Sequence, residues 1–441
     1  MLILADNSDK EKKVNLQPLV NTYKSSKNKF KINLAHANVI NLISWFALFM
    51  SFNNLLVLGT NISMFLFIYL LIQTVRKYSV IQLAALPHWA VLFFALGAII
   101  SVYDVNASGE DARARSMSVI VNFIYWSVLI ITVSNLAPKI GLLRDENLYK
   151  MAGYIAFGVF LCVLFYEFKN VLSFPFLKRN TPNSYAFVLV CYSSIAMVYL
   201  RKKYSRNAML FGLSVILFSM LFLERRAGFM LVASSTFFAL NFDKLTLKTV
   251  VSMLFVGLFG FVLLQLDLVK GGLKNASPRI YETIYESENI STQDQSYLTR
   301  VAMIEKGMVI FQENPLTGIG LNNFSNHYVK IPGNFIGSDL VVQKELNDKS
   351  GHNSYIALLA EGGLLVLVPF LILLFYNIYH FVKDFKKRTR IESAFYWSFI
   401  AMCIHIYFIS EIYNVFAWFL ISMVTAISIK YSRIDKMKQY S

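Results

Sequence analysis

Long apolar stretches recur along the chain, and they constrain its fold more than any other feature. A helix that crosses the hydrocarbon core of a bilayer needs roughly 20 apolar residues. Over the whole chain 56% of residues are apolar and only 15% are charged, which predicts that lipid surrounds most side chains. The stretches lie approximately at 36–53, 55–75, 79–103, 116–138, 151–169, 183–200, 207–223, 227–242, 248–267, 354–382, 393–410 and 412–430. The sequence therefore predicts an all-α polytopic membrane protein with about 12 transmembrane helices.

The distribution of Lys and Arg predicts how these helices are oriented. Basic residues stay on the cytoplasmic side of a membrane, and most of the 42 Lys and Arg residues fall in alternate connections when both termini are placed inside. This assignment gives a polar cytoplasmic tail (1–35), nine helices (36–267), a large periplasmic loop (268–352), three helices (353–430) and a basic cytoplasmic tail (431–441). Topology explains the net charge of +16 without a nucleic-acid partner, and the basic tails could also contact anionic membrane lipids.

The polar residues of the chain do not suggest a cofactor. All three cysteines (Cys162, Cys191 and Cys403) lie in apolar stretches, and the six histidines lack the spacing that places two metal ligands on one helix face. No phosphate-binding glycine loop and no Asp-x-Asp pair for a metal-bound nucleotide sugar occur. The polar, Lys-rich beginning has no apolar core typical of a cleaved signal peptide, so we expect the first apolar stretch to be an uncleaved anchor.

Arginines on the expected outer side are the first candidates for function. Arg225 and Arg226 stand in the short external connection 223–228, where two guanidinium groups suit a phosphate. They could equally be turn residues that pair with Glu224. Arg300 falls in the first turn of a helix predicted over 297–312, with apolar positions at Val301, Ile304, Met308 and Phe311, and could be a solvated helix charge.

The end of the long loop supplies the remaining candidates. After a turn-forming segment with Pro315, Gly318 and Gly320, His352 stands where the chain enters the tenth stretch, and Asn353 or Ser354 could cap that helix. Glu361 follows nine residues later, where a carboxylate in a membrane helix is costly unless it is paired or functional. The adjacent Gly362 and Gly363 favour close helix packing or a local distortion.

Together these positions resemble one family of bacterial envelope enzymes. The pattern consists of Arg300, Phe311, Pro315, Gly318, Gly320, Asn323 and Phe324, followed by His352–Asn353 and Glu361–Gly362 at the start of a membrane helix. It is similar to the O-antigen ligases and Wzy-type polymerases. The resemblance is specific over roughly 297–370, and the topology with a large late loop extends it across most of the chain.

The resemblance implies a glycosyltransferase of the bacterial inner membrane that works without a metal or nucleotide. Its donor would be a glycan on undecaprenyl pyrophosphate, and its acceptor lipid A core in a ligase or a second lipid-linked repeat in a polymerase. Arg300 and one of Arg225 and Arg226 would bind the pyrophosphate, His352 would act on the acceptor hydroxyl, and Glu361 and Asn353 would support the site. Val366 and Ile304 depart from the family pattern and leave ligase and polymerase both open.

A protein of another class, a lipid-linked oligosaccharide flippase or other transporter, would also show about twelve spans. Such a protein usually places its charged residues in a central cavity and has short loops. Here the charged candidates gather at one face under a long loop, which favours the enzyme.

Overall fold

A computed structural model describes most of the apolar part of the chain and much of the long loop. It describes residues 37–51, 56–57, 60–61, 66–72, 83, 85–103, 110–167, 181–222, 226–241, 266–276, 281, 285, 295–331, 340–349, 351–410 and 412–439. Within these ranges the chain is helical apart from turns and one antiparallel pair of two-residue strands, β1 (Leu56–Val57) and β2 (Thr60–Asn61).

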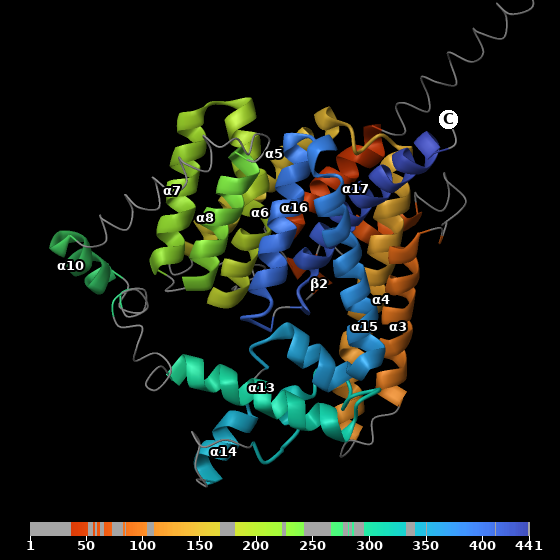
Figure 1. Cartoon of the computed structure of the whole chain (residues 1–441), viewed down its shortest axis with the longest axis vertical. Coiled ribbons are helices and arrows are strands. Elements are labelled where there is room, and N and C mark those ends of the chain that lie inside the picture. Colours follow the sequence, from red (N-terminus) through yellow and green to blue (C-terminus); the bar gives the residue numbers. More distant parts are fainter. Residues whose placement is uncertain are drawn as a thin grey trace, which may run out of the picture.

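Most of the helices form a bundle, and a smaller layer lies across one end of it (Figure 1). The bundle contains the helix Ala37–Ser51, α3 (Leu86–Tyr103), α4 (Glu110–Lys139), α5 (Asp145–Glu167), α6 (Pro182–Lys203), α7 (Arg206–Phe222), α8 (Arg226–Asn241), α15 (Ser354–Lys383), α16 (Arg390–His405) and α17 (Val415–Gln439). The outer layer contains α13 (Gln295–Glu313), the 3-10 turn η3 (Phe324–Asn326) and α14 (Leu340–Asn347). A second 3-10 turn, η4 (Phe385–Lys387), joins α15 to α16, and α10 is Asp267–Ala276.

The interior of the bundle is built largely from aromatic rings and from one central helix. Every side chain of α6 from Tyr185 to Val198 is buried, because α5, α8 and α16 all pack against this helix. On the other side, α17 packs on α4, where the rings of Trp126 and Trp418 stack with centroids 5.0 Å apart. Stacked aromatic pairs add to the stabilisation that comes from burial of their apolar area.

The outside of the bundle is apolar as well, as a lipid environment requires. Four helices are long and apolar enough to cross a membrane: Arg113–Lys139, Asp145–Glu167, Pro182–Lys203 and Ser354–Lys383. Large apolar side chains point outward from these and neighbouring helices, among them Phe93, Phe157, Phe160, Phe211, Phe218 and Phe375. A soluble monomer rarely exposes so much apolar surface. The helical, membrane-type architecture is therefore confirmed.

The helices agree with most of the predicted stretches but not with all of them. The prediction of a continuous helix over 55–75 is wrong, because β1 and β2 occupy part of this segment and only residues 66–72 are helical among those described. The predicted stretch 248–267 lies almost wholly outside the described residues. Helix α17 continues through Gln439, well into the segment predicted as a tail.

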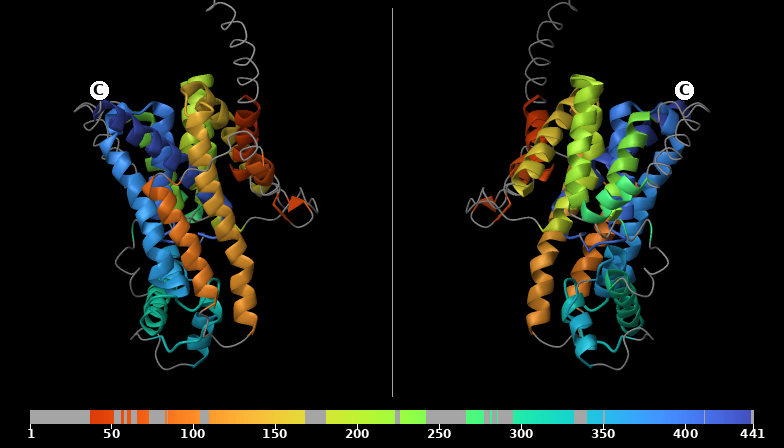
Figure 2. Two further views of the ribbon diagram at one scale, coloured as in Figure 1. Left: turned by 90° about the vertical axis from the view of Figure 1, so that its right-hand side faces the viewer. Right: turned by 90° about the vertical axis from the view of Figure 1, so that its left-hand side faces the viewer.

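The two ends of the bundle differ in what they carry. Figures 1 and 2 place α13 and α14 at one end, and the α4–α5, α6–α7 and α15–α16 connections at the other. Hydrogen bonds tie this second end together, since Lys430 Nζ donates to Glu392 Oε1 (2.7 Å) and to the carbonyl oxygen of Leu143 (3.4 Å). The connections predicted to share the cytoplasmic side therefore do gather at one end of the molecule.

Candidate active site

Helix α15 is broken near its beginning, and the break organises the outer layer. Gly363 has φ 61° and ψ −161°, which interrupts the helix after its first turns. Figure 1 shows the part of α15 before the break beside α13 and the part after it rising through the bundle. The local distortion that the paired glycines predicted is thus present at Gly363.

The turn-forming segment of the loop fills this break. The amides of Leu364 and Leu365, which a continuous helix would bond internally, donate instead to the carbonyl oxygens of Pro315 (2.9 Å) and Leu316 (3.1 Å). In return, the amide of Ile319 donates to the carbonyl oxygen of Ala360 (3.0 Å). These bonds satisfy backbone groups that burial would otherwise leave unpaired.

Two glycines make this close approach possible. A Cβ atom at Gly363 would lie 2.2 Å from the carbonyl oxygen of Leu316, and one at Gly318 would lie 2.4 Å from the carbonyl carbon of Glu361. Both residues also have positive φ, which glycine adopts at no steric cost. The predicted turn is confirmed, and its backbone lies against the backbone of α15. The chain after this turn forms the 3-10 turn η3.

Glu361 holds this arrangement together. Its Oε1 accepts a hydrogen bond from the amide of Phe324 (2.9 Å), and its Oε2 accepts one from the hydroxyl of Tyr413, in the connection between α16 and α17. The side chain is buried. Both carboxylate oxygens are therefore occupied by the loop and by the last connection of the bundle, which gives Glu361 a positioning role.

Helix α4 also forms hydrogen bonds with the same loop. Arg115 Nε donates to Oδ1 of Asn323 (2.9 Å), and Nδ2 of Asn323 donates to the hydroxyl of Ser116 (2.9 Å). Ser116 in turn donates to the carbonyl oxygen of Leu321 (2.8 Å). The loop is thus fixed to α4 as well as to α15, with the guanidinium of Arg115 at the edge of the site.

A buried lysine fastens the rest of the outer layer. Lys306 Nζ, on α13, donates to the carbonyl oxygens of Phe324 (2.6 Å) and Asn347 (2.8 Å) and lies 4.8 Å from the centre of the Phe324 ring. Desolvation lowers the pKa of Lys306 to about 8. The amide side chain of Asn347 then pairs with both backbone groups of Val329, each at 3.0 Å.

The buried side of α13 differs from the predicted one. The helix itself is confirmed, but Met308 is 39% exposed and Val301, Ile304 and Phe311 are only partly buried. The buried positions are Ala302, Met303, Lys306, Gly307 and Ile310. The spacing of apolar residues predicted the wrong buried face because a lysine, Lys306, occupies the centre of the face that is actually buried.

His352 stands in a strained turn directly before α15. Its φ is 49°, a left-handed conformation that is uncommon outside glycine and often found at functional sites. Asn353 caps the helix, as its Oδ1 accepts hydrogen bonds from the amides of Tyr355 (3.0 Å) and Ile356 (3.2 Å). Ser354 instead donates from its hydroxyl to the carbonyl oxygen of Ile409 (2.7 Å). The cap predicted at Asn353 or Ser354 is therefore Asn353.

The start of α15 meets the end of α16 and the start of α8. The amide of Ser354 donates to the carbonyl oxygen of Ile406 (2.8 Å), the residue that follows α16. Its neighbour His405 is buried, and a Cβ atom at Gly228 in the first turn of α8 would lie 3.6 Å from Cε1 of His405. Arg226, the first residue of α8, lies two residues before Gly228.

Arg300 belongs to the same region. It lies seven residues before Gly307 on α13, hence on the same helix face and about 10 Å along the axis. A Cβ atom at Gly307 would lie 2.2 Å from Cγ2 of Ile356, so α13 and the start of α15 touch at this point. Arg300 and His352 therefore both lie within about two helical turns of the contact between Gly307 and Ile356.

The proposed pyrophosphate-binding and catalytic assignments stay predictions. Arg225 lies outside the described residues, and only the backbone of Arg226 is described. Sequence reasoning missed Arg115, Lys306 and Tyr413. Arg115 stands just before an apolar stretch on the expected outer side, a signal that would have drawn attention to it. Among the described residues no three His, Cys, Asp or Glu side chains gather where they could hold a metal ion.

Comparison with known families addresses the segment that contains most of these residues. Residues 204–371 match the family model described as O-antigen ligase. The chain is therefore similar to the O-antigen ligases over this segment, its O-antigen ligase domain. The resemblance inferred from the sequence is thereby confirmed. No curated protein matches the chain at a significant level.

The O-antigen ligase domain runs from the start of α7 into α15 and includes α8, α13, Gly318, His352 and Gly363. It thus contains both halves of the interlock between the loop and the broken helix. Arg115, His405 and Tyr413, which complete the surroundings of the site, lie outside the matched residues. The match to the O-antigen ligase family supports a ligase-like or polymerase-like role in polysaccharide assembly, with lipid-linked glycans in general as substrates.

Proposed function

We propose that the protein transfers a glycan from undecaprenyl pyrophosphate to an acceptor hydroxyl, at the periplasmic face of the bacterial inner membrane and with inversion at the sugar. The observation that carries this proposal is the meeting of α8, α13, α15 and α16 at one end of the bundle. Arg226 is the first residue of α8, Arg300 lies on α13 and His352 directly precedes α15, and all three residues lie in the O-antigen ligase domain. The gathering of basic connections at the opposite end supports the orientation.

The chemistry needs positively charged side chains beside the leaving pyrophosphate and a base near the acceptor hydroxyl. The acceptor oxygen attacks the anomeric carbon while the bond from that carbon to the pyrophosphate oxygen breaks. The pyrophosphate keeps the electron pair, and Arg300 with Arg225 or Arg226 stabilises the charge that develops there. His352 takes the proton from the acceptor hydroxyl. The products are the glycoside, undecaprenyl pyrophosphate and a protonated histidine, and the step requires no metal.

The acceptor decides between two closely related activities. Lipid A core as acceptor makes the protein an O-antigen ligase, which is the function we propose, and a second lipid-linked repeat makes it a polymerase. A deletion strain separates these activities. Long lipid-linked polymer beside bare lipid A core is expected for a ligase, whereas core capped with single repeats would identify a polymerase.

Transfer by purified protein in detergent tests the catalytic assignment. With a lipid-linked glycan as donor, His352→Ala is expected to lower the rate by about 10² to 10⁴-fold, the usual contribution of a general base. Arg300→Lys should cost about 10² to 10³-fold, because a lysine cannot replace a bidentate guanidinium. Arg206 is the first residue of α7 and lies at the end of the bundle away from α13. Arg206→Lys is therefore the matched control and should leave the rate unchanged.

A second histidine variant separates chemistry from backbone strain. His352→Asn introduces a residue that tolerates the left-handed conformation but cannot act as a base. It should fold as the wild type does and remain inactive. Near-normal transfer by both His352→Asn and Arg300→Lys would overturn the proposal. Transfer in detergent by the wild type also excludes a pure transporter, because no second compartment is present.

A further inference from the structure

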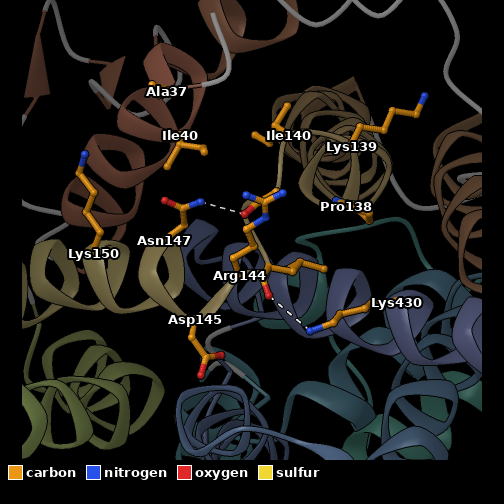
Figure 3. A pocket seen from close by; sticks show the side chains of 12 residues that line it. Ala37, Ile40, Pro138, Lys139, Ile140, Arg144, Asp145, Asn147, Lys150 and Lys430 are labelled. Carbon is orange, nitrogen blue, oxygen red and sulfur yellow. Dashed lines mark hydrogen bonds between the residues drawn. The ribbon is translucent and has the colours of Figure 1, made fainter. Parts of the chain in front are cut away.

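A cavity of about 940 Å³ opens at the end of the bundle opposite α13 (Figure 3). It lies where α4 ends and α5 begins, beside the first turn of the helix Ala37–Ser51 and the last part of α17. Its lining residues include Ile40, Lys139, Arg144, Asn147, Lys150 and Lys430. None of these residues belongs to the O-antigen ligase domain or to the candidate active site.

Cations dominate the charged lining of the cavity. The lining contains four cationic side chains and a single carboxylate, that of Asp145; the cations are Lys139, Arg144, Lys150 and Lys430. Figure 3 shows Arg144 pointing into the space between Asn147 and Ile140, with Lys139 and Lys150 at opposite edges. The lining therefore favours an anion of more than one charge, as phosphate groups are.

The turn before α5 is shaped to place Arg144 there. Gly141 adopts φ 72°, and its carbonyl oxygen accepts a hydrogen bond from Nδ2 of Asn147 (2.9 Å). A Cβ atom at residue 141 would lie only 3.2 Å from Nε of Arg144. Among the described residues, the side chains of Arg144 and Lys139 form no ion pair, whereas Lys430 is paired with Glu392 (2.7 Å). Two cations of the cavity are thus available to a ligand.

The position of the cavity at the ends of two membrane-type helices favours a lipid as the source of the phosphate. Two helices apolar enough to cross a membrane, Arg113–Lys139 and Asp145–Glu167, end and begin at its edge. A cavity at this position lies where spans leave the hydrocarbon core, which is the level of lipid headgroups. Its walls combine the cations with apolar residues such as Ile40, Pro138 and Leu143. This combination suits an amphiphile better than a soluble phosphate.

We propose that the cavity between α4 and α5 binds the phosphate headgroup of an anionic phospholipid, with Arg144 as its central contact and Lys139 and Lys150 at the rim. The site is separate from the transfer reaction and does not depend on it. Bound lipid would brace the ends of α4 and α5 against the helix Ala37–Ser51.

Native mass spectrometry of the full chain, transferred from phosphatidylcholine nanodiscs and titrated with phosphatidylglycerol, tests the proposal. The wild type is expected to bind phosphatidylglycerol in preference to phosphatidylcholine, and more weakly as salt increases. The double variant Arg144→Gln with Lys139→Gln should bind it about 30-fold more weakly, from the usual contribution of two surface cations. Lys202→Gln with Lys203→Gln, two exposed cations at the same end, is the matched control and should bind as the wild type does.

Two further measurements keep the result decisive. Apparent melting temperatures in pure phosphatidylcholine should be equal for both double variants, because Arg144 and Lys139 are exposed. Glycerol 3-phosphate at millimolar concentration should not displace the lipid. Equal binding of the two lipids, an unchanged affinity in the cavity variant, or displacement by glycerol 3-phosphate would each overturn the lipid assignment.

Discussion

The carboxylate of Glu361 accepts a hydrogen bond from the backbone amide of Phe324, 2.9 Å away. This bond joins the broken start of α15 to the loop that fills the break, and Tyr413 closes the group from the last connection of the bundle. A carboxylate in an apolar stretch therefore has a structural reason to be present, independent of any contact with substrate.

Replacement of Glu361 separates its structural role from a chemical one. Glu361→Ala leaves the amide of Phe324 and the hydroxyl of Tyr413 buried without an acceptor, at a cost of about 1–3 kcal/mol for each group. Glu361→Gln keeps an acceptor of the same size, so transfer activity is expected to stay within about tenfold of the wild type. Apparent melting temperature and transfer rate check both variants. An inactive Glu361→Gln protein with wild-type stability would show that Glu361 takes part in the chemistry.

Substitution at the break in α15 should be severe. Gly363→Ala forces a Cβ atom into the carbonyl of Leu316 and into a backbone conformation that is essentially restricted to glycine. We expect the free energy of unfolding to fall by at least about 3 kcal/mol. This loss should appear as a low yield of folded protein and as loss of the monodisperse peak in fluorescence-detected size-exclusion chromatography at a lower temperature than for the wild type. Gly271→Ala in α10, where a Cβ atom would meet nothing within 4 Å, is the control. Equal yields of the two variants would contradict the interlock between the loop and the helix.

Stability should rise with pH in a window set by Lys306. Because burial lowers the pKa of Lys306 from 10.5 to about 8, the folded protein loses this proton at a lower pH than the unfolded chain does. The unfolded state binds more protons between pH 8 and 10.5, so the contribution of Lys306 to the free energy of unfolding increases across that window. The total gain is about 3 kcal/mol, and the full cost of the buried charge applies below pH 8.

Apparent melting temperature measured from pH 7 to 10 checks this dependence. Lys306→Met should remove the rise while leaving two carbonyl oxygens without their donor. Lys330→Met, at an exposed lysine of the same layer, should retain the rise. A rise of equal size in the Lys306→Met protein would assign it to other groups.

The cap of α15 provides a test of how the turn at His352 is held. Asn353→Ala removes the side-chain acceptor for the amides of Tyr355 and Ile356 and should cost about 0.5–2 kcal/mol. Hydrogen exchange is expected to become faster at these two amides, and transfer activity to fall with the disordered turn. Asn353→Asp, which keeps the cap, should behave as the wild type. Unchanged exchange in Asn353→Ala would show that the turn is held by other contacts.

The sequence predicted the helical membrane architecture because apolar length is a direct physical requirement of a bilayer. It also predicted α13, the tight turn at Gly318 and the distortion at Gly363, since glycine pairs mark places where side chains do not fit. A strand pair within 55–75 escaped notice because its apolar residues read as part of a span. Local composition alone does not distinguish these two structures.

The partners of the site residues were the least predictable part. Glu361 was expected to support the site, but its partners were not predicted: its carboxylate oxygens accept hydrogen bonds from Phe324 and Tyr413, residues that come together only in the folded bundle. Lys306 was overlooked for a related reason. A lysine in an amphipathic helix is usually solvated, and only the carbonyl groups of Phe324 and Asn347, brought in from distant segments, make its burial tolerable.

The contact between Tyr413 and Glu361 has a consequence for biogenesis. The outer layer depends on a hydroxyl group that is synthesised after α15 and α16 and only shortly before α17. The long loop is thus synthesised before the residue that fixes it in place, and the layer can reach its final shape only when the last pair of helices has been added. A nascent chain that stops after Lys383 would carry every residue of the O-antigen ligase domain and still lack a properly assembled site.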